Sequence, residues 1–361
     1  MKAIKMWRRW GIAGLTGFLL IAAPSAIAQH KAAGSAAAGS RAAMTQPFLI
    51  VETRKGFATL QQAVDAIGTG RGTIRIASGR YRQCAVQQAG SISYVAAEAG
   101  GAIFEAALCE GRAALLLRGT AARLDGLVFQ HMMAGKDEAR SATAILLESG
   151  SLSITNSLFR TSDAALQTAD LANVTVNISQ SSFLRLGRCP SGGAGCSSGV
   201  TLGQIARLRL ISSYFSGSAG GPLLSSRAKI LDAEHNRFED GSDDRSGDAA
   251  AAPMLALPSG AAGRIRHNEF LLHRASYGVQ SALIAVAEDG RDNESRGLVI
   301  DENSAIWAAP DDGHEDNAHN GRKSGAGALF VANYSGEPVA VGHNELSAGI
   351  AAYQRPTAPA R

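Results

Sequence analysis

The segment GSDDRSGD carries three carboxylates and a guanidinium within six positions, at Asp243, Asp244, Arg245 and Asp248. Paired carboxylates can act as acid and base on a sugar linkage, or can hold calcium that neutralises an acidic substrate. We therefore take Asp243, Asp244 and Arg245 as candidate catalytic residues. The alternative is a solvated charged loop, which is the commoner use of such a segment.

A second acid-rich segment, DDGHED, has the donor atoms that hard divalent cations prefer, together with an imidazole. The candidate metal ligands are Asp311, Asp312, His314, Glu315 and Asp316. Such a set could hold a divalent cation such as calcium. The alternative is again a soluble charged loop, and no cofactor is firmly implied.

A third candidate combines a base with a cation. His273, Arg274 and Tyr277 lie within five positions. Removing a proton beside a carboxylate requires a base, and the resulting anion requires a positive partner. These three residues can supply both functions, or they can be ordinary loop residues.

Arginines recur shortly after repeated phenylalanines, at Arg160, Arg185 and Arg188. If they align, they form a positive strip suited to binding uronate or sulfate groups. Asp163 offers the alternative that they form surface salt bridges.

The elements that position these residues follow from a repeat. A short apolar stretch and a small polar turn precede a recurring apolar residue, at intervals of 23 to 40 residues. This residue is Phe129, Phe159, Phe183, Phe215, Phe238 and Phe270, with Ile306 and Leu346 as substitutes. A repeat of roughly 20 to 50 residues is typical of a stacked solenoid.

Each unit contains short strands of period two and no helix between them, which argues against a doubly wound α/β sheet. We predict an all-β fold, a right-handed parallel β-helix of about ten coils, with the Phe residues stacked inward as a column. Asparagine recurs at the bend, at Asn156, Asn236, Asn268, Asn303 and Asn344. It suits a left-handed bend, and its amide can bond from coil to coil.

FATLQQAVDAI, residues 57–67, has helical spacing and is expected to cover the open N-terminal end of the stack. Nearly every long insertion follows the recurring Phe. Insertions at equivalent positions of a solenoid emerge at one corner, so we expect these loops to form one rim, and we place any site there.

The chain has 361 residues, 45% of them hydrophobic. Residues 1–28 are predicted to be a signal peptide, because a basic stretch precedes an apolar run and the site Ala26-Ile27-Ala28. An uncleaved N-terminal anchor is the alternative. Residues 29–46 form an Ala/Gly/Ser linker, 47–350 the β-helix and 351–361 a disordered tail. Without the leader's four basic residues, 31 Lys+Arg face 31 Asp+Glu. No basic tract indicates nucleic acid, and we expect a monomer.

The four cysteines lie in the part predicted to be exported, where disulfides persist. We predict the pairs Cys84–Cys109, close to one repeat apart, and Cys189–Cys196, which close a Gly-rich loop. Free buried thiols are the alternative. The spacing does not fit a zinc site.

RGTIRIASGRYRQCAV, preceded by FATLQQAVDAI and followed by the I-x-N-x-F units, resembles secreted bacterial β-helices of the pectin-lyase-like superfamily over residues 47–350. This superfamily includes polysaccharide lyases, esterases, polygalacturonases, epimerases and adhesins, and the chain is most similar to its members of unassigned activity. The NTD, GHG and RIK units of polygalacturonases are absent. GRYRQ is similar to an esterase turn, but the esterase glutamine and aspartate motifs are missing.

The resemblance implies a periplasmic or secreted protein that binds an extended acidic polysaccharide along a loop-lined groove. Whether it also cleaves that polymer stays open. If the protein is an enzyme, a polysaccharide lyase is favoured over a glycoside hydrolase. The alternative is a non-catalytic cell-envelope binding or structural protein.

Overall fold

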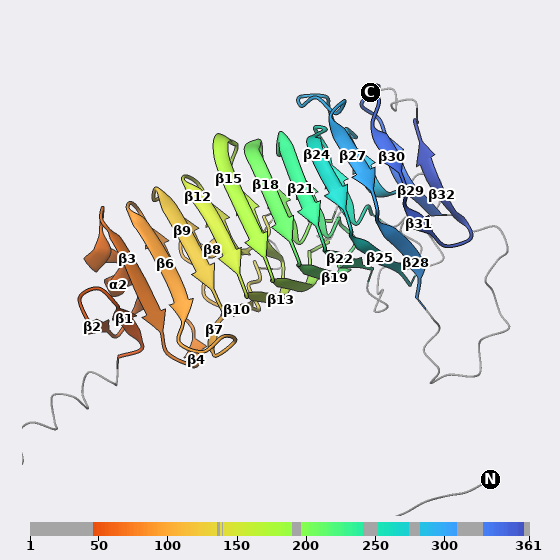
Figure 1. Cartoon of the computed structure of the whole chain (residues 1–361). Helices are drawn as coiled ribbons and strands as arrows, with labels where there is room; N and C mark the ends of the chain where they lie inside the picture. The colour runs from red at the N-terminus through yellow and green to blue at the C-terminus, as the bar shows by residue number, and fades with distance from the viewer. Residues whose placement is uncertain are drawn as a thin grey trace, which may run out of the picture. The chain divides into compact units, whose positions relative to one another are not determined.

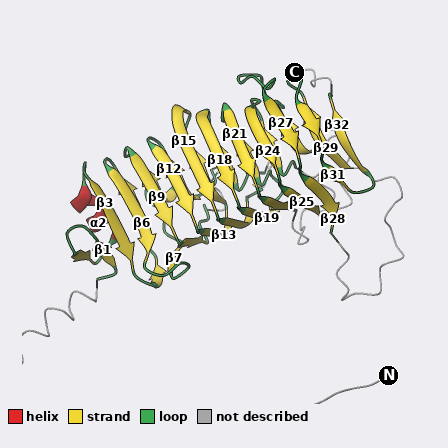
Figure 2. Ribbon diagram, viewed as in Figure 1, coloured by secondary structure: helices red, strands yellow, loops and turns green. Residues whose placement is uncertain are grey.

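The computed structural model describes residues 46–135, 138, 140–189, 196–240, 252–273, 282–308 and 328–356. The predicted leader and almost all of the linker lie outside these residues. Within them, the chain winds through three parallel sheets, A, B and C, and each passage through all three makes one coil (Figures 1 and 2). Each sheet has ten parallel strands, so the predicted parallel β-helix of about ten coils is confirmed.

In spatial order, sheet A consists of β2 (Lys55–Phe57), β1 (Phe48–Ile50), β3 (Arg71–Ile76), β6 (Ser91–Ala96), β9 (Ala121–Asp125), β12 (Ser151–Thr155), β15 (Leu171–Ser179), β18 (Ile205–Ile211), β21 (Ile230–Glu234), β24 (Ala262–Arg266), β27 (Leu298–Asp301) and β30 (Ala340–Gly342). Sheet B consists of β4 (Gly79–Tyr81), β7 (Ala102–Glu105), β10 (Leu127–Gln130), β13 (Leu158–Ser162), β16 (Ser182–Leu186), β19 (Tyr214–Ser218), β22 (Arg237–Glu239), β25 (Glu269–Leu272), β28 (Ser304–Trp307) and β31 (Glu345–Leu346). Sheet C consists of β5 (Ala85–Gln87), β8 (Ala113–Leu117), β11 (Thr143–Leu147), β14 (Ala164–Thr168), β17 (Val200–Leu202), β20 (Leu224–Ser226), β23 (Leu255–Leu257), β26 (Ala282–Val286), β29 (Ala328–Asn333) and β32 (Ile350–Gln354).

The N-terminal end of the stack is covered in two ways. In sheet A, β1 pairs antiparallel with β3, and β2 adds outside β1. The helix α2 (Leu60–Ile67) lies at the same end and packs against β5 of sheet C as well as β1, β2 and β3 of sheet A. It begins three residues later than predicted, because Phe57 belongs to β2 and Thr59 caps the helix by accepting a bond from the Gln62 amide.

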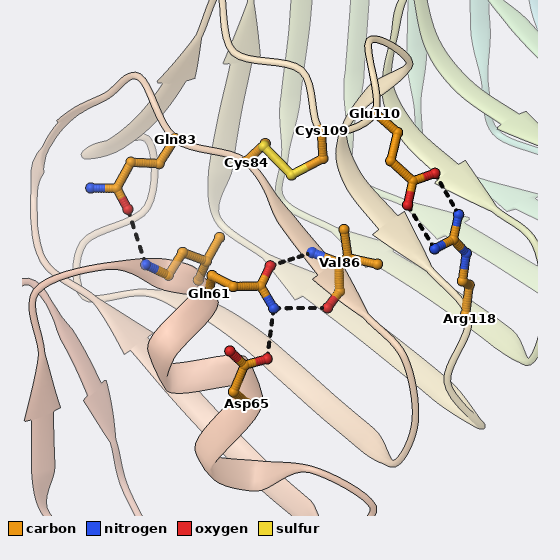
Figure 3. Close-up of a disulfide and its surroundings, with 9 residues drawn as sticks. Gln61, Asp65, Gln83, Cys84, Val86, Cys109, Glu110 and Arg118 are labelled. Atoms are coloured by element: carbon orange, nitrogen blue, oxygen red, sulfur yellow. Dashed lines mark hydrogen bonds and ion pairs between the residues drawn. A yellow bond between two sulfur atoms is a disulfide. The ribbon is translucent and has the colours of Figure 1, made fainter.

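One side chain of α2 closes the exposed edge of β5 (Figure 3). Gln61 accepts a hydrogen bond from the Val86 amide at 2.8 Å and donates one to the Val86 carbonyl at 3.1 Å. An unpaired strand edge is a template for aggregation, and these bonds remove both polar groups from that edge. The helix therefore has the covering function that its sequence predicted.

The recurring aromatic side chains form one continuous column inside the β-helix. Rings in successive coils lie 4.6–5.3 Å apart between centroids and are mostly stacked. The column consists of Tyr81, Phe104, Phe129, Phe159, Phe183, Phe215, Phe238 and Phe270. The sequence pattern missed its first two members, because Tyr81 is not a phenylalanine and Phe104 follows a longer turn than those of the later units.

The predicted continuation of the column through Ile306 is wrong by one residue. Phe270 is in register with Ala305, and Ala305 with Leu346. Ile306 alternates outward, whereas Ala305 is fully buried. Phe330 from sheet C fills the space that the small alanine leaves, and its ring meets Phe270 edge-on at 5.5 Å.

A ladder of polar side chains runs along the bend between sheets A and B. In its C-terminal half, each asparagine donates its Nδ2 to the Oδ1 of the asparagine in the next coil at 2.9 Å, from Asn236 through Asn268 and Asn303 to Asn344. Serines occupy the same place in earlier coils. Ser213 links the two halves, since its amide donates to Asn236 Oδ1 at 2.9 Å.

Asn156 does not belong to this ladder, contrary to the prediction. Ser157 occupies the ladder position, and Asn156 is the exposed residue before it, with φ +49°. The left-handed conformation belongs to this preceding position throughout, for example at His235 and His267. Asparagine is therefore selected at the bend for its coil-to-coil amide bonds and not for its backbone conformation.

Replacing Asn268 with leucine should lower the free energy of unfolding by about 2–3 kcal/mol, because it leaves the buried amides of Asn236 without their acceptor. Asn268→Ser is the matched control. A serine can accept from the Asn236 backbone amide, as the serines of earlier coils do, so the cost should fall to about 1 kcal/mol. Urea unfolding followed by circular dichroism measures both, and equal costs would contradict the ladder.

Both predicted disulfides are present, Cys84–Cys109 (Figure 3) and Cys189–Cys196. Cys84 and Cys109 link neighbouring coils with their Cα atoms 5.4 Å apart. They are not equivalent positions. Cys109 lies ahead of β8 and forms a bridge with Ala113, the first residue of that strand, whereas Ala85, next to Cys84, is in register with Leu115. The first bond therefore ties the loop before β8 to the first coil.

Removing the Cys84–Cys109 bond with paired serines should cost about 3 kcal/mol, because it closes a 25-residue separation. Removing Cys189–Cys196, with a separation of 7, should cost about 1 kcal/mol less on the same loop-closure argument. The free energy of unfolding of the two double variants tests this order. A larger loss at the short loop would show that chain entropy does not decide the outcome.

The fold continues beyond residue 350, where the sequence predicted a disordered tail. β32 pairs with β29, and Tyr353 packs against the core. The physical reason is that IAAYQ places Tyr353 in register with Val331. Among the described residues, no helix is both long and apolar enough to span a membrane.

Candidate functional site

Most of the long connections of the β-helix run from sheet B to sheet C, although residues 287–297 form another long connection, from sheet C to sheet A. The chain leaves sheet B and enters sheet C through residues 131–142, 187–199, 240–254, 273–281 and 308–327, whereas the bend from A to B takes only a few residues. We call the corner between sheets B and C, with the adjoining outer face of sheet B, the rim. It is where the sequence placed the functional residues.

Many of the predicted site residues lie outside the described part of the chain. These are Asp243, Asp244, Arg245, Arg274, Tyr277, Asp311, Asp312, His314, Glu315 and Asp316. They stay predictions. Within the described ranges, no group of three His, Cys, Asp or Glu side chains is arranged to hold a metal ion.

The three predicted arginines do not form a single column. Arg160 is in register with Gln130 and Leu184 on the outer face of sheet B, and its guanidinium donates to the Gln130 side-chain oxygen at 2.7 and 2.9 Å. Arg185 is one position further on, exposed, with φ +52°. Neither of these two forms an ion pair with a described residue.

Arg188 has a structural role in place of the predicted one. It contacts the buried carboxylate of Asp163 at 3.5 Å and donates to the Gly135 carbonyl at 2.8 Å. The Asp163 carboxylate also accepts hydrogen bonds from the backbone amides of Ala134 and Ala142, so it holds both of these parts of the connection from β10 to β11 in place. Its salt bridge with Arg188 is the alternative that the sequence left open.

His273, the one described member of the third candidate, lies in a cluster of polar side chains. Its Nε2 is 2.8 Å from Glu239 Oε1, and the Tyr214 hydroxyl donates to Glu239 Oε2 at 2.5 Å. Arg237 lies 3.4 Å from the same carboxylate and over the Tyr214 ring. The backbone amide of His273 donates to the buried Asp240 at 2.5 Å, which holds the start of its loop.

Glu239 organises this cluster electrostatically. Burial alone raises its pKa, but the hydrogen bonds from Tyr214 and His273 and the charge of Arg237 hold the pKa below the usual carboxyl value. Burial, and then the hydrogen bond to Glu239, raise the pKa of Tyr214. At neutral pH, Glu239 is therefore an ionised acceptor and Tyr214 a protonated donor.

This arrangement leaves one imidazole nitrogen available. Because Glu239 accepts from Nε2, the proton sits on Nε2 in neutral His273, and Nδ1 can accept a proton. The side chain of His273 is 25% exposed, so a ligand on the rim can reach it. A carboxylate that orients a histidine is the usual way to prepare a general base.

Sequence reasoning selected His273 but missed Glu239, Tyr214 and Arg237. A signal was present. Tyr214 immediately precedes a column Phe, and Glu239 immediately follows the next one. Side chains alternate along a strand, so residues on either side of an inward Phe point outward onto the rim face. Arg160 occupies the same outward position as Glu239, after its own Phe.

No protein-family model matches the chain, and no curated protein matches its sequence. Two solved structures are similar in fold. An alginate lyase from a Paenibacillus species shares 11% identity at a TM-score of 0.46, over 82% of this chain and 95% of that chain. The A-module of a mannuronan C-5 epimerase from Azotobacter vinelandii shares 10% identity at a TM-score of 0.33, with the same coverage. The parallel β-helix itself is established by the three sheets of parallel strands.

Proposed function

We propose that this protein is exported and binds an extended acidic polysaccharide along the rim. The observation that carries the proposal is the distribution of charge along one face. The guanidiniums of Arg160 and Arg185, which form no ion pair with a described residue, lie on the same side of the β-helix as the His273 cluster, several coils apart from it.

The spacing favours a polymer over a small ligand. Arg160 and Glu239 occupy one register column and are separated by three strand spacings, or about 14 Å. That separation is too large for one compact ligand, but a polymer lying along the stack can contact both. Guanidinium groups bind carboxylates or sulfates through paired hydrogen bonds, which suits a chain bearing acidic groups.

Two disulfides support export. Cys84–Cys109 links the first coils, and Cys189–Cys196 closes a loop on the rim. Such bonds persist in oxidising compartments. Together with the basic and apolar leader pattern, they favour the periplasm or the medium as the site of action.

Cleavage by elimination is a second candidate function, and the His273 cluster favours it. His273 Nδ1 would take the proton beside the uronate carboxylate, and Arg237 would stabilise the anion that forms. The glycosidic C–O bond would then break, leaving one sugar with a new C=C bond; the departing oxygen would take a proton from water, and His273 would return its proton to the solvent.

A panel of uronate polymers, each with and without calcium, tests both functions. Calcium is included because the predicted ligands at residues 311–316 would use it. Binding measured by calorimetry supports the first proposal, and absorbance from the unsaturated product supports the second. Binding without product would leave a non-catalytic glycan-binding protein. Absence of binding to every acidic polymer would contradict the proposal.

A further inference from the structure

The arginines of this β-helix are unevenly distributed among its sheets. The ten parallel strands of sheet A carry seven arginines and four carboxylates, a net of +3. The strands of sheet B carry four of each, a net of zero, and those of sheet C carry no charge. The sheet A arginines are Arg71, Arg75, Arg123, Arg207, Arg209, Arg264 and Arg266.

Three of these arginines are neutralised by carboxylates on or beside the same sheet. Arg123 pairs with Asp125, and Arg207 with Asp232; Arg266 contacts Asp301 and Glu302. The other four are Arg71, Arg75, Arg209 and Arg264. Each is exposed and forms no ion pair with a described residue, so the excess positive charge of the sheet resides on them.

The four unpaired arginines face the same way. Residues of sheet A alternate between core and surface, and all four occupy surface positions. Arg209 and Arg264 belong to one register column and are two strand spacings apart, or about 10 Å. Asp232 lies between them, but its charge is taken up by Arg207.

Hydrogen-bonding groups occupy that column on the N-terminal side of Arg209, whereas Val299 and Ala340 follow Arg264. Ser153 and Asn177 precede Arg209 in register. Over β3 to β15 the face has a shallow hollow of about 310 Å³, with Arg71 and Arg123 among its lining residues. A chain lying along the sheet can therefore alternate contacts with hydroxyl, amide and guanidinium groups over about 34 Å, the seven strand spacings from Arg71 to Arg264.

We propose that the outer face of sheet A is a second binding surface, for a polysaccharide bearing carboxylate or sulfate groups. The positive charge matches such a polymer, and the hydroxyl and amide groups match its sugars. A single-stranded nucleic acid fits less well, since its bases need aromatic platforms. Tyr94 is the only aromatic residue in these ten strands, all of which the structure describes, and it is buried. The surface is separate from the rim and does not depend on it.

The test uses the full protein and two matched double variants. Arg209→Ala with Arg264→Ala removes two exposed cations of sheet A, and Arg160→Ala with Arg185→Ala removes two from the rim. The probes are polygalacturonate and dextran sulfate, with neutral dextran as the blank, and calorimetry gives the affinity at low and high salt. We expect the sheet A variant to lose about tenfold in affinity for at least one polyanion and to show a weaker salt dependence.

A second pair, Arg209→Lys with Arg264→Lys, keeps the charge but removes the planar fork, so its affinity should fall between those of the wild type and the alanine variant. Wild-type affinity and salt dependence in the sheet A alanine variant would overturn the proposal, and so would a wild-type protein that binds neither polymer. Tighter binding of oligo-dT than of either polysaccharide would assign the surface to nucleic acid instead. An effect of the rim variant alone would leave the proposed function standing and remove only the second surface.

Discussion

Replacing Phe159 with alanine is expected to lower the free energy of unfolding by about 3–5 kcal/mol. The ring is fully buried and stacks between Phe129 at 5.3 Å and Phe183 at 5.0 Å. Its removal would therefore open a cavity with aromatic walls above and below, in a column whose neighbours are held by their own strands. Urea unfolding monitored by circular dichroism measures the loss.

Met133→Ala is the control for this substitution, because the side chain is 54% exposed and its removal should cost no more than about 0.5 kcal/mol. Phe159→Leu should lie between the two, since it keeps much of the apolar volume. A Phe159→Ala variant within about 1 kcal/mol of the wild type would show that the coils collapse around the missing ring, contrary to the close packing expected of a core.

The second large effect is expected at the rim. For a polymer that the protein cleaves, His273→Ala should lower the turnover rate by a factor of about 10²–10⁴, the usual contribution of a general base. Binding should change little, because Arg160 and Arg185 are untouched. Product absorbance and calorimetry separate the two quantities, and a wild-type rate in this variant would remove His273 from the mechanism.

Glu239→Gln provides a sharper comparison. It keeps the size of the side chain but loses the charge that fixes the His273 proton on Nε2, so the rate should fall while the protein stays folded.

The dependence of the folding stability on pH follows from the direction of the Glu239 pKa shift. The pKa of Glu239 is lowered in the folded protein, so its contribution to stability is present above the unfolded carboxyl pKa and is lost as the pH falls through the folded value. Glu239→Gln should remove that part of the acid sensitivity.

The sequence was most informative about the column. An inward aromatic residue repeated in each coil is a local property of each unit, so Phe129 to Phe270 could be recognised without knowing any contact. The sequence was less informative where a residue from another sheet fills the space beside a small side chain. Ala305 fills the column position only because Phe330 arrives from another sheet, 25 residues later, and no local pattern at Ile306 reveals this.

The candidate site also combines features that the sequence predicted with features that it did not. His273 was identified from its type and its place on a long loop, and the rim was identified because insertions after equivalent residues emerge together. Its partners were not, because Tyr214, Glu239 and His273 come from three successive coils and are 25 and 34 residues apart. The three predicted arginines do not form one column for a related reason, since Arg188 contacts Asp163, whereas Arg160 and Arg185 occupy different positions on sheet B.

The sequence by itself therefore determined the architecture: a parallel β-helix of ten coils, its two disulfides, its covering helix and the corner that carries its long loops. Each of these features depends on a repeat or on the boundary of an element. Both can be recognised from residues that are close to one another in the sequence. Only the tertiary structure decided which side chains share a site and which charges remain unpaired. Those outcomes depend on the register between strands one coil apart, and a shift of a single residue, as at Ile306 and Asn156, turns a side chain from the core to the surface.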